Sequence, residues 1–240
     1  DDVIALAKML TGWTVDITGR SADGFLFNAA AHEPGDKNLL GLRFGESGEN
    51  EARLALQSLA LHPACAQFIA EKLARHFISD TPSAASVHTL AQSYSRSGGR
   101  LLDVYRSLIS LPDIWQAPLQ KIKTPNDFII SLLRAADIDI DDMRLAAAFR
   151  TLGQVPFSAP SPAGWSDMGK DWLGGEALLR RIDIAQNVAA AIHTRIDPSD
   201  LLEQTIGPVA AEATRTAVRR AGSPAEAITL IFASPEFQRR

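Results

Sequence analysis

Apolar residues recur every three or four positions along most of this 240-residue sequence, which is the spacing of α-helices. The clearest segment covers residues 126–136, and its apolar face consists of Phe128, Ile129, Leu132, Leu133 and Ala136. Thr124 and Pro125 precede this segment, a pair typical of a helix N-cap followed by the first helical position. The pattern therefore predicts a helix that begins at Pro125.

The same spacing predicts helices at the start of the chain and over residues 175–193, 209–221 and 224–233. Two further helices are predicted between residues 51 and 77, and we expect their apolar faces to be buried. These faces carry Leu54, Ser58, Leu61, Phe68, Ile69, Leu73, His76 and Phe77.

Only one region has the pattern of β-strands, and it covers about residues 24–44. Its two halves are "DGFLFNA" and "KNLLGLRF", separated by Glu33, Pro34, Gly35 and Asp36. Proline followed by glycine at the two central positions is typical of a type II turn. The sequence therefore predicts a mainly α protein, an irregular multi-helix bundle with one small β-hairpin whose tip is this turn.

Composition places the chain among ordinary globular proteins, with 46% hydrophobic and 22% charged residues. A net charge of -4 argues against a broad nucleic-acid-binding surface. No apolar run approaches the roughly 20 residues that cross a bilayer. Cys65 is the single cysteine, so an intramolecular disulfide is excluded. We expect one domain over residues 1–240, and because Asp1 opens directly into a helical pattern, we expect a C-terminal part of a longer protein.

The turn region supplies the candidate catalytic residues His32, Asp36 and Lys37, as acid–base groups or as part of a metal site. A metal site needs three or four converging ligands, and the local sequence offers three at most. We therefore predict no metal and no cofactor. Two structural alternatives stay open: the charges are solvated at a turn, or Lys37 forms an ion pair that joins the hairpin to the helical body.

A long irregular stretch, residues 153–175, contains three prolines, five glycines and two tryptophans. A loop of this length is usually functional or disordered, and large apolar tryptophans argue against disorder. Trp165 and Trp172, with the neighbouring Asp167, are therefore candidate ligand-binding residues for a sugar or a proline-rich chain. In the alternative, both tryptophans hold the loop on the core, with each indole N–H bonded to backbone.

Arg180 completes the candidate ligand-binding set, because it follows the glycine-rich end of this loop by less than two helical turns. Its guanidinium could bind an anion or hydrogen-bond to carbonyl groups of the loop. The alternative is an internal ion pair with Asp171 or Asp183.

Several segments, in this order and spacing, resemble the bacterial domain-of-unknown-function family 1800. They are "LAKMLTGWTV", "HEPGDKNLLG", "HPACAQFIAEKLARHF", "LISLPDIW", "KTPNDFIISLLRA", "LGQVPFSAPSPAGW", "WLGGEALLRRIDIA" and "ASPEFQRR". The resemblance covers nearly the whole chain. It implies no activity and no catalytic residues. It does imply export, a second uncharacterised exported protein encoded nearby, and a further N-terminal part about as long as this chain.

Two functions stay open at this point, beside a purely structural role in which this region only packs against the further N-terminal part. The first is a binding or scaffold module of an exported or envelope-associated bacterial protein, whose partners are the N-terminal part of the same chain and another exported protein. The second is a hydrolase-like or metal-dependent enzyme whose site that N-terminal part completes. The sequence contains no nucleophile motif and no phosphate-binding glycine motif. The exported location rests on the resemblance alone.

Overall fold

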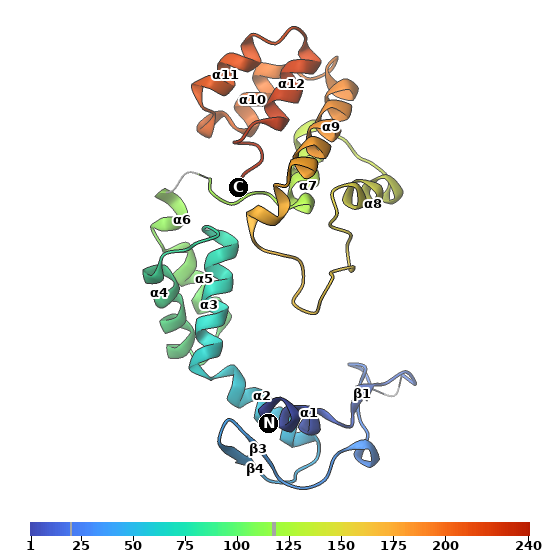
Figure 1. Ribbon diagram of the computed structural model, residues 1–240, viewed down its shortest axis with the longest axis vertical. Coiled ribbons are helices and arrows are strands. Elements are labelled where there is room, and N and C mark those ends of the chain that lie inside the picture. Colours follow the sequence, from blue (N-terminus) through green and yellow to red (C-terminus); the bar gives the residue numbers. More distant parts are fainter. Residues whose placement is uncertain (20, 117–118) are drawn as a thin grey trace. The chain divides into compact units, whose positions relative to one another are not determined.

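The computed structural model describes residues 1–19, 21–116 and 119–240, and most of these residues are helical (Figure 1). They form two compact units. Unit 1 consists of Asp1–Glu71 with Val87–Ser110, and unit 2 consists of Lys72–Ser86 with Leu111–Arg240. The predicted mainly α class is confirmed, since the described residues contain twelve α-helices and only four short strands. A single domain over residues 1–240 stays a prediction.

The elements follow one another along the chain in a fixed order. From the N-terminus to α5 they are α1 (Asp2–Leu10), β1 (Trp13–Val15), β2 (Phe25–Phe27), η1 (Ala29–Ala31), β3 (Lys37–Leu39), β4 (Leu42–Phe44), α2 (Glu49–Ala60), α3 (Pro63–Phe77), α4 (Ala84–Arg96) and α5 (Leu101–Ile109). The rest are α6 (Asp113–Gln116), α7 (Pro125–Ala136), α8 (Asp142–Thr151), η2 (Gly169–Trp172), α9 (Gly175–Ile192), α10 (Pro198–Thr205), η3 (Gly207–Val209), α11 (Glu212–Arg219) and α12 (Pro224–Ala233).

The strands of unit 1 pair differently from the prediction. β1 pairs antiparallel with β2, with Trp13 opposite Phe27, and β3 pairs antiparallel with β4, with Leu39 opposite Leu42. The prediction of one hairpin over residues 24–44 is therefore wrong, because the described residues form two small hairpins. The stretch with the expected turn connects one hairpin to the other instead of closing either one.

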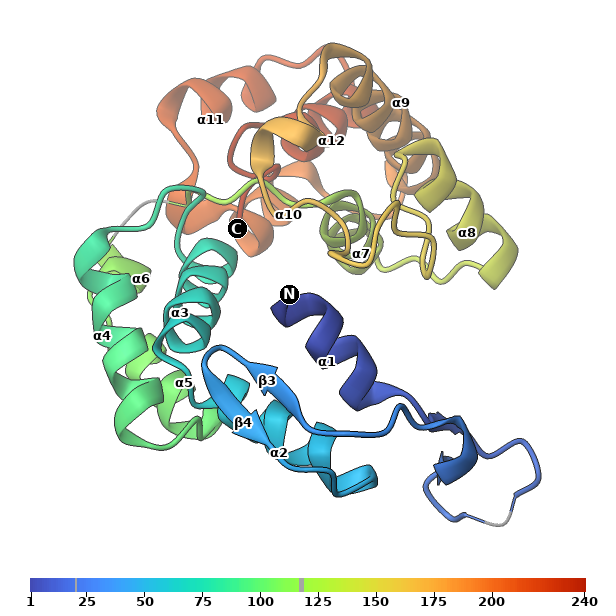
Figure 2. The ribbon, with the colours of Figure 1, turned by 60° about the horizontal axis from the view of Figure 1, so that its bottom comes forward.

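The error has a local cause. Gly35 does have a positive φ of 87°, as the second central residue of a type II turn requires. The tight reversal between β3 and β4 lies at Leu40 and Gly41, whose φ angles are 48° and 78°. Two consecutive positive φ angles are the mark of the two-residue hairpin loop. A leucine is rarely found at such a position, so no local sequence pattern predicts this reversal. Figure 2 shows this second hairpin beside α1 and α2.

The buried faces of α2 and α3 also differ from the prediction. On α2 the buried residues are Glu51, Ala52 and Ala55, whereas Leu54 and Leu61 are exposed. On α3 the fully covered positions are Ala66, Ala70 and Ala74, whereas Phe68, His76 and Phe77 are exposed. Both helices have two neighbouring stripes of apolar residues, and the alanine stripe permits the closer approach of backbones. Periodicity identifies a stripe but not which of two stripes meets the core.

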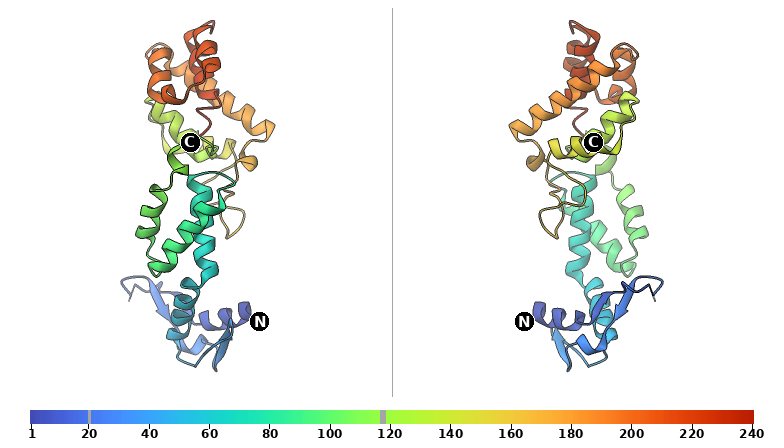
Figure 3. Two further views of the ribbon diagram at one scale, coloured as in Figure 1. Left: turned by 90° about the vertical axis from the view of Figure 1, so that its left-hand side faces the viewer. Right: turned by 90° about the vertical axis from the view of Figure 1, so that its right-hand side faces the viewer.

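Unit 2 has a continuous apolar core built by α7, α8, α9, α10, α11 and α12. Thr124 caps α7 through a capping box with Asp127, and Pro125 is its first residue, as the sequence predicts. The helix predicted over residues 175–193 is α9, which packs against α12 (Figure 3). The core side chains include Phe128, Ile129, Leu132, Ala136, Ala185, Ala189 and Ile192.

Candidate functional site

A long loop of unit 2 leaves the end of α8 and returns at η2, and hydrogen bonds hold it where it begins (Figures 1 and 3). The Nη1 group of Arg180 donates to the carbonyl oxygen of Thr151 over 2.7 Å. The backbone N–H of Asn126 donates to the side-chain oxygen of Gln154 over 2.8 Å. Arg180 also forms an ion pair with Glu176, 2.5 Å away. The sequence offers Asp171 or Asp183 as the ion-pair partner of Arg180, and the observed partner is Glu176 instead. Glu176 lies one helical turn before Arg180, where residues four positions apart face each other.

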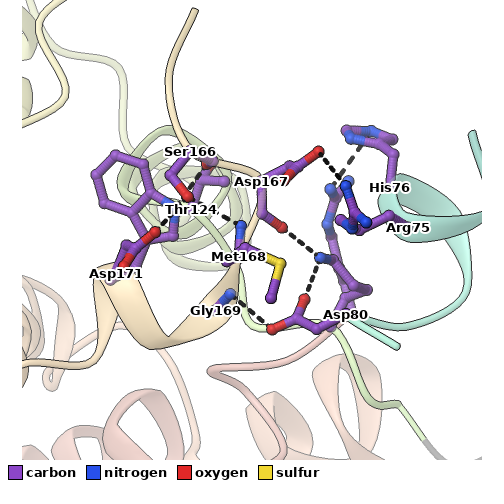
Figure 4. Close-up of polar contacts among 12 residues, drawn as sticks. Arg75, His76, Asp80, Thr124, Ser166, Asp167, Met168, Gly169 and Asp171 are labelled. Atoms are coloured by element: carbon purple, nitrogen blue, oxygen red, sulfur yellow. Dashed lines mark hydrogen bonds and ion pairs between the residues drawn. The ribbon is translucent and has the colours of Figure 1, made fainter. Parts of the chain in front are cut away.

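Hydrogen bonds and an ion pair also hold the loop where it returns to the helical body. One carboxylate oxygen of Asp80 accepts the backbone N–H of Gly169 over 2.7 Å, and the other is paired with the ammonium of Lys121. The same ammonium donates to the carbonyl oxygen of Asp167 over 2.6 Å (Figure 4). A Cβ atom at Gly169 would lie 3.0 Å from the Asp80 carboxylate and 3.2 Å from the Ile122 side chain, so a larger residue would have to displace these neighbours slightly.

The side chain of Asp167 is the second attachment. Its Oδ2 atom lies 2.9 Å from the ammonium of Lys72 on α3. The same oxygen lies 3.9 Å from Nη1 of Arg75, also on α3 (Figure 4). Burial alone would raise the pKa of the Asp167 carboxyl, but the Lys72 hydrogen bond and the two positive charges outweigh it and lower this pKa. Asp167 therefore stays ionised and holds the loop against the end of α3.

The two tryptophans have different environments. Trp172 is buried, and its Nε1–H donates to the carbonyl oxygen of Ser166 over 3.0 Å. Trp165 is half-buried, with its ring centre 6.0 Å from that of Trp172. Ser166 further donates to Asp171 over 2.5 Å and accepts the N–H of Met168. Trp172 thus has the arrangement expected of a residue that holds the loop, whereas Trp165 is covered only in part.

Between these two attachments the loop is exposed. Residues 156–164, which we call the arm, are all exposed, and they contain Pro156, Pro160 and Pro162. Phe157 is fully exposed and has a φ of 57°. A bulky residue with positive φ is a genuine outlier. The described chain leaves this side chain uncovered and its backbone strained.

The candidate catalytic residues lie in unit 1 and are only partly brought together. The ammonium of Lys37 lies 2.7 Å from Oε2 of Glu51, and Nε2 of His32 lies 3.5 Å from the same oxygen. Lys37 also donates to the carbonyl oxygen of Glu33 over 2.5 Å, and Nδ1 of His32 lies 2.9 Å from the carbonyl oxygen of Thr11. We call His32, Lys37 and Glu51 the buried triad, because all three side chains are almost fully covered.

Asp36 is not part of the buried triad. Its carboxylate is paired with the guanidinium of Arg43 on β4 and accepts the N–H of Glu46, and both partners are exposed. The Arg43 hydrogen bond and charge hold the pKa of Asp36 below its usual value. Glu51 was not identified from the sequence. The one feature that could have indicated it is that this acidic residue shares a face of α2 with Ala52 and Ala55. The arrangement joins β3 to α2 through Lys37.

The described part of the chain was also compared with the requirements of a metal site and of a membrane-spanning helix. No group of three or more His, Cys, Asp and Glu side chains within it is placed to hold a metal ion. None of its helices combines the length and apolar character needed to cross a membrane.

The fold and the site define a mainly helical protein that presents an exposed arm from a firmly attached loop. Such a description fits no single known activity. The chain belongs to the family described as "Protein of unknown function (DUF1800)", whose family model matches residues 1–239. The resemblance found in the sequence motifs is thereby confirmed. Comparisons with curated proteins and with solved structures gave no match.

Proposed function

We propose that this chain is a binding module and that the arm contacts a partner protein. The observation that carries the proposal is Phe157, a fully exposed aromatic side chain on a loop held at both ends. An apolar side chain of this size is normally buried. Its exposure to water is unfavourable in free energy, and a partner that covers it removes this penalty. The attachments lower the conformational entropy that binding has to remove.

The composition of the arm favours a protein as the ligand. Pro156, Pro160 and Pro162 restrict the backbone and favour extended conformations. Extended proline-containing segments bind in aromatic-lined grooves of other proteins, with an exposed aromatic side chain as a natural anchor. A sugar would instead need the open face of a tryptophan, and Trp172 is buried with its indole N–H already bonded.

Unit 1 supports the same class of function. Leu54, Leu56 and Leu61 at α2 and Phe68 on α3 are exposed, although each is large and apolar. We propose that these side chains pack against the further N-terminal part of a longer protein, which the family resemblance implies. The resemblance also supports an exported bacterial protein and a second exported protein as the partner of the arm.

Immobilised peptide and glycan arrays test this proposal. The chain should bind peptides, and Phe157→Ser should weaken the signal about tenfold or more, since a central aromatic anchor commonly contributes 2 kcal/mol or more. Trp165→Ala should weaken it as well. Met143→Ala is the matched control, because Met143 is an exposed apolar residue of α8 outside the arm. Absence of any binding, glycan binding alone, or equal binding by Phe157→Ser would contradict the proposal.

The second candidate function is an enzyme, and the buried triad is the observation that favours it. Clusters of buried ionisable groups are common at active sites, although structural ion pairs produce them too. In this function His32 and Lys37 act with Glu51 instead of Asp36, and residues outside this sequence complete the site. Activity screening of the longer protein with His32→Gln and Asp36→Asn separates the functions: an enzyme loses turnover only in the first variant, and a binding module has no turnover to lose.

A further inference from the structure

An open hollow of about 370 Å³ in unit 2, distant in sequence from the arm, is lined by both cationic and apolar side chains. We call it the Lys123 cavity. Lys123 precedes α7, Ile130, Ser131 and Arg134 lie on α7, and Phe237 follows α12. The described residues that line it include two cations and no acidic side chain. Its apolar wall is formed by Ile130 and Phe237.

The two cations of this cavity lack counterions within the described part of the chain. The ammonium of Lys123 lies 4.1 Å from the centre of the Phe237 ring, and no carboxylate of a described residue forms an ion pair with it. The guanidinium of Arg134 likewise has no hydrogen bond or ion pair with any described residue. Two positive charges without described counterions, beside one apolar wall, attract an anion, because an anion would restore the interactions that the half-buried Lys123 ammonium loses on leaving water; the exposed Arg134 adds its charge at the rim.

The surroundings of Lys123 make the charge of its amine depend on pH near neutrality. Burial of the ammonium, together with the positive charges of Arg181 and Arg240, lowers the pKa of Lys123 to about 8, and Asp127 only partly opposes this. A bound anion would favour the protonated amine, so anion binding and proton binding at Lys123 strengthen each other.

We propose that the Lys123 cavity binds a small organic carboxylate, with its charged group held by Lys123 and Arg134 and its apolar body against Ile130 and Phe237. The planar guanidinium of Arg134 matches a carboxylate through two parallel hydrogen bonds. The hydroxyl of Ser131 supplies a further donor. The apolar wall favours a carboxylate with a hydrocarbon body over a bare inorganic anion.

Calorimetric titration of the full chain with sodium benzoate, and separately with inorganic phosphate, tests the site at constant ionic strength. Benzoate should bind with one-to-one stoichiometry. Lys123→Met and Arg134→Met should each weaken binding about tenfold or more, since each removes a charge-assisted hydrogen bond. Arg144→Met is the matched control, because Arg144 is exposed on α8 in a surface ion pair, outside the cavity.

The pH dependence supplies a readout that a structural role of Lys123 would not give. Benzoate affinity should be highest below pH 8 and fall as pH rises through about 8, because Lys123 then loses its charge. Lys123→Arg should retain binding and abolish this dependence, since arginine stays charged throughout that range. Circular dichroism of each variant verifies folding.

Three outcomes would overturn the proposal. The first is that benzoate does not bind, whether or not phosphate does. The second is equal weakening by Arg144→Met, which would show only a response to net charge. The third is unchanged affinity in folded Lys123→Met and Arg134→Met proteins.

Discussion

In each unit of the molecule, a buried lysine joins segments that lie apart in the sequence. In unit 1, Lys37 contacts the Glu51 carboxylate and the carbonyl oxygen of Glu33. In unit 2, Lys121 contacts the Asp80 carboxylate and the carbonyl oxygen of Asp167. Both lysine side chains are 4% exposed. The same chemistry therefore joins segments that lie far apart in the sequence.

The two arrangements differ in their carboxylates. The Glu51 side chain is fully buried, whereas that of Asp80 is 32% exposed. Glu51 is also shared between Lys37 and His32, whereas Asp80 divides its two oxygens between Lys121 and a backbone N–H. A charge removed from a fully buried cluster leaves partners that water cannot reach. We therefore expect unit 1 to depend on its carboxylate for stability and unit 2 to depend on its carboxylate for local order of the loop.

The largest expected effect is that of Glu51→Gln. It leaves the Lys37 ammonium buried without a counterion, and the free energy of unfolding should fall by about 3–5 kcal/mol. Urea denaturation monitored by circular dichroism measures this loss. The double variant Lys37→Met with Glu51→Leu should recover most of it, because replacing a buried ion pair by apolar residues is often neutral. A single-variant loss under about 1 kcal/mol would remove the distinction between the two units.

A smaller effect is expected for Asp80→Asn. Lys121 keeps its bond to the Asp167 carbonyl, and water reaches the site in part, so the loss should be about 1–3 kcal/mol. Hydrogen exchange followed by mass spectrometry should show faster exchange in residues 166–172, which contain the Gly169 amide bonded to Asp80. Lys170→Met is the control, since Lys170 is an exposed lysine of the same segment. Unchanged exchange in Asp80→Asn would show that the other contacts suffice.

Acid should weaken the buried triad in a defined pH range. Burial would raise the pKa of Glu51, but hydrogen bonds from Lys37 and the Ser47 N–H, with the Lys37 charge, outweigh it and hold this pKa below its ordinary value of 4.5. A lowered folded-state pKa means that the stabilisation is complete above 4.5 and is lost as pH falls through the lower value. The difference in unfolding free energy between wild type and Glu51→Gln should shrink below pH 4.5. A constant difference in acid would contradict this assignment.

The smallest effect is expected for Asp36→Asn. Its ion pair with Arg43 is exposed and screened by water, so urea denaturation should give a small fraction of the loss seen for Glu51→Gln. A loss comparable to that of Glu51→Gln would place Asp36 in the same cooperative cluster as the buried triad.

The candidate site could be predicted only in part. Trp165, Trp172 and Asp167 were identified because a long loop with large aromatic residues is unusual in a compact protein. Asp80 and Lys121 were missed, because they lie 89 and 46 residues from their partners Gly169 and Asp167 in the loop and have no local motif. Glu51 was missed for the same reason: its partners are on another segment, and an acidic residue on a helix is normally solvated.

The sequence by itself determined the helical class, the start of α7 at Pro125 and the family, because caps, periodicity and motif order are properties of neighbouring residues. Tertiary structure decided which strands pair, which stripe of α2 and α3 is buried, and which charges meet. Strand pairing joins distant residues, so the local Pro34–Gly35 signal located a turn but not its hairpin. The burial of Glu51 likewise depends on Lys37 and His32, which only the folded chain brings to it.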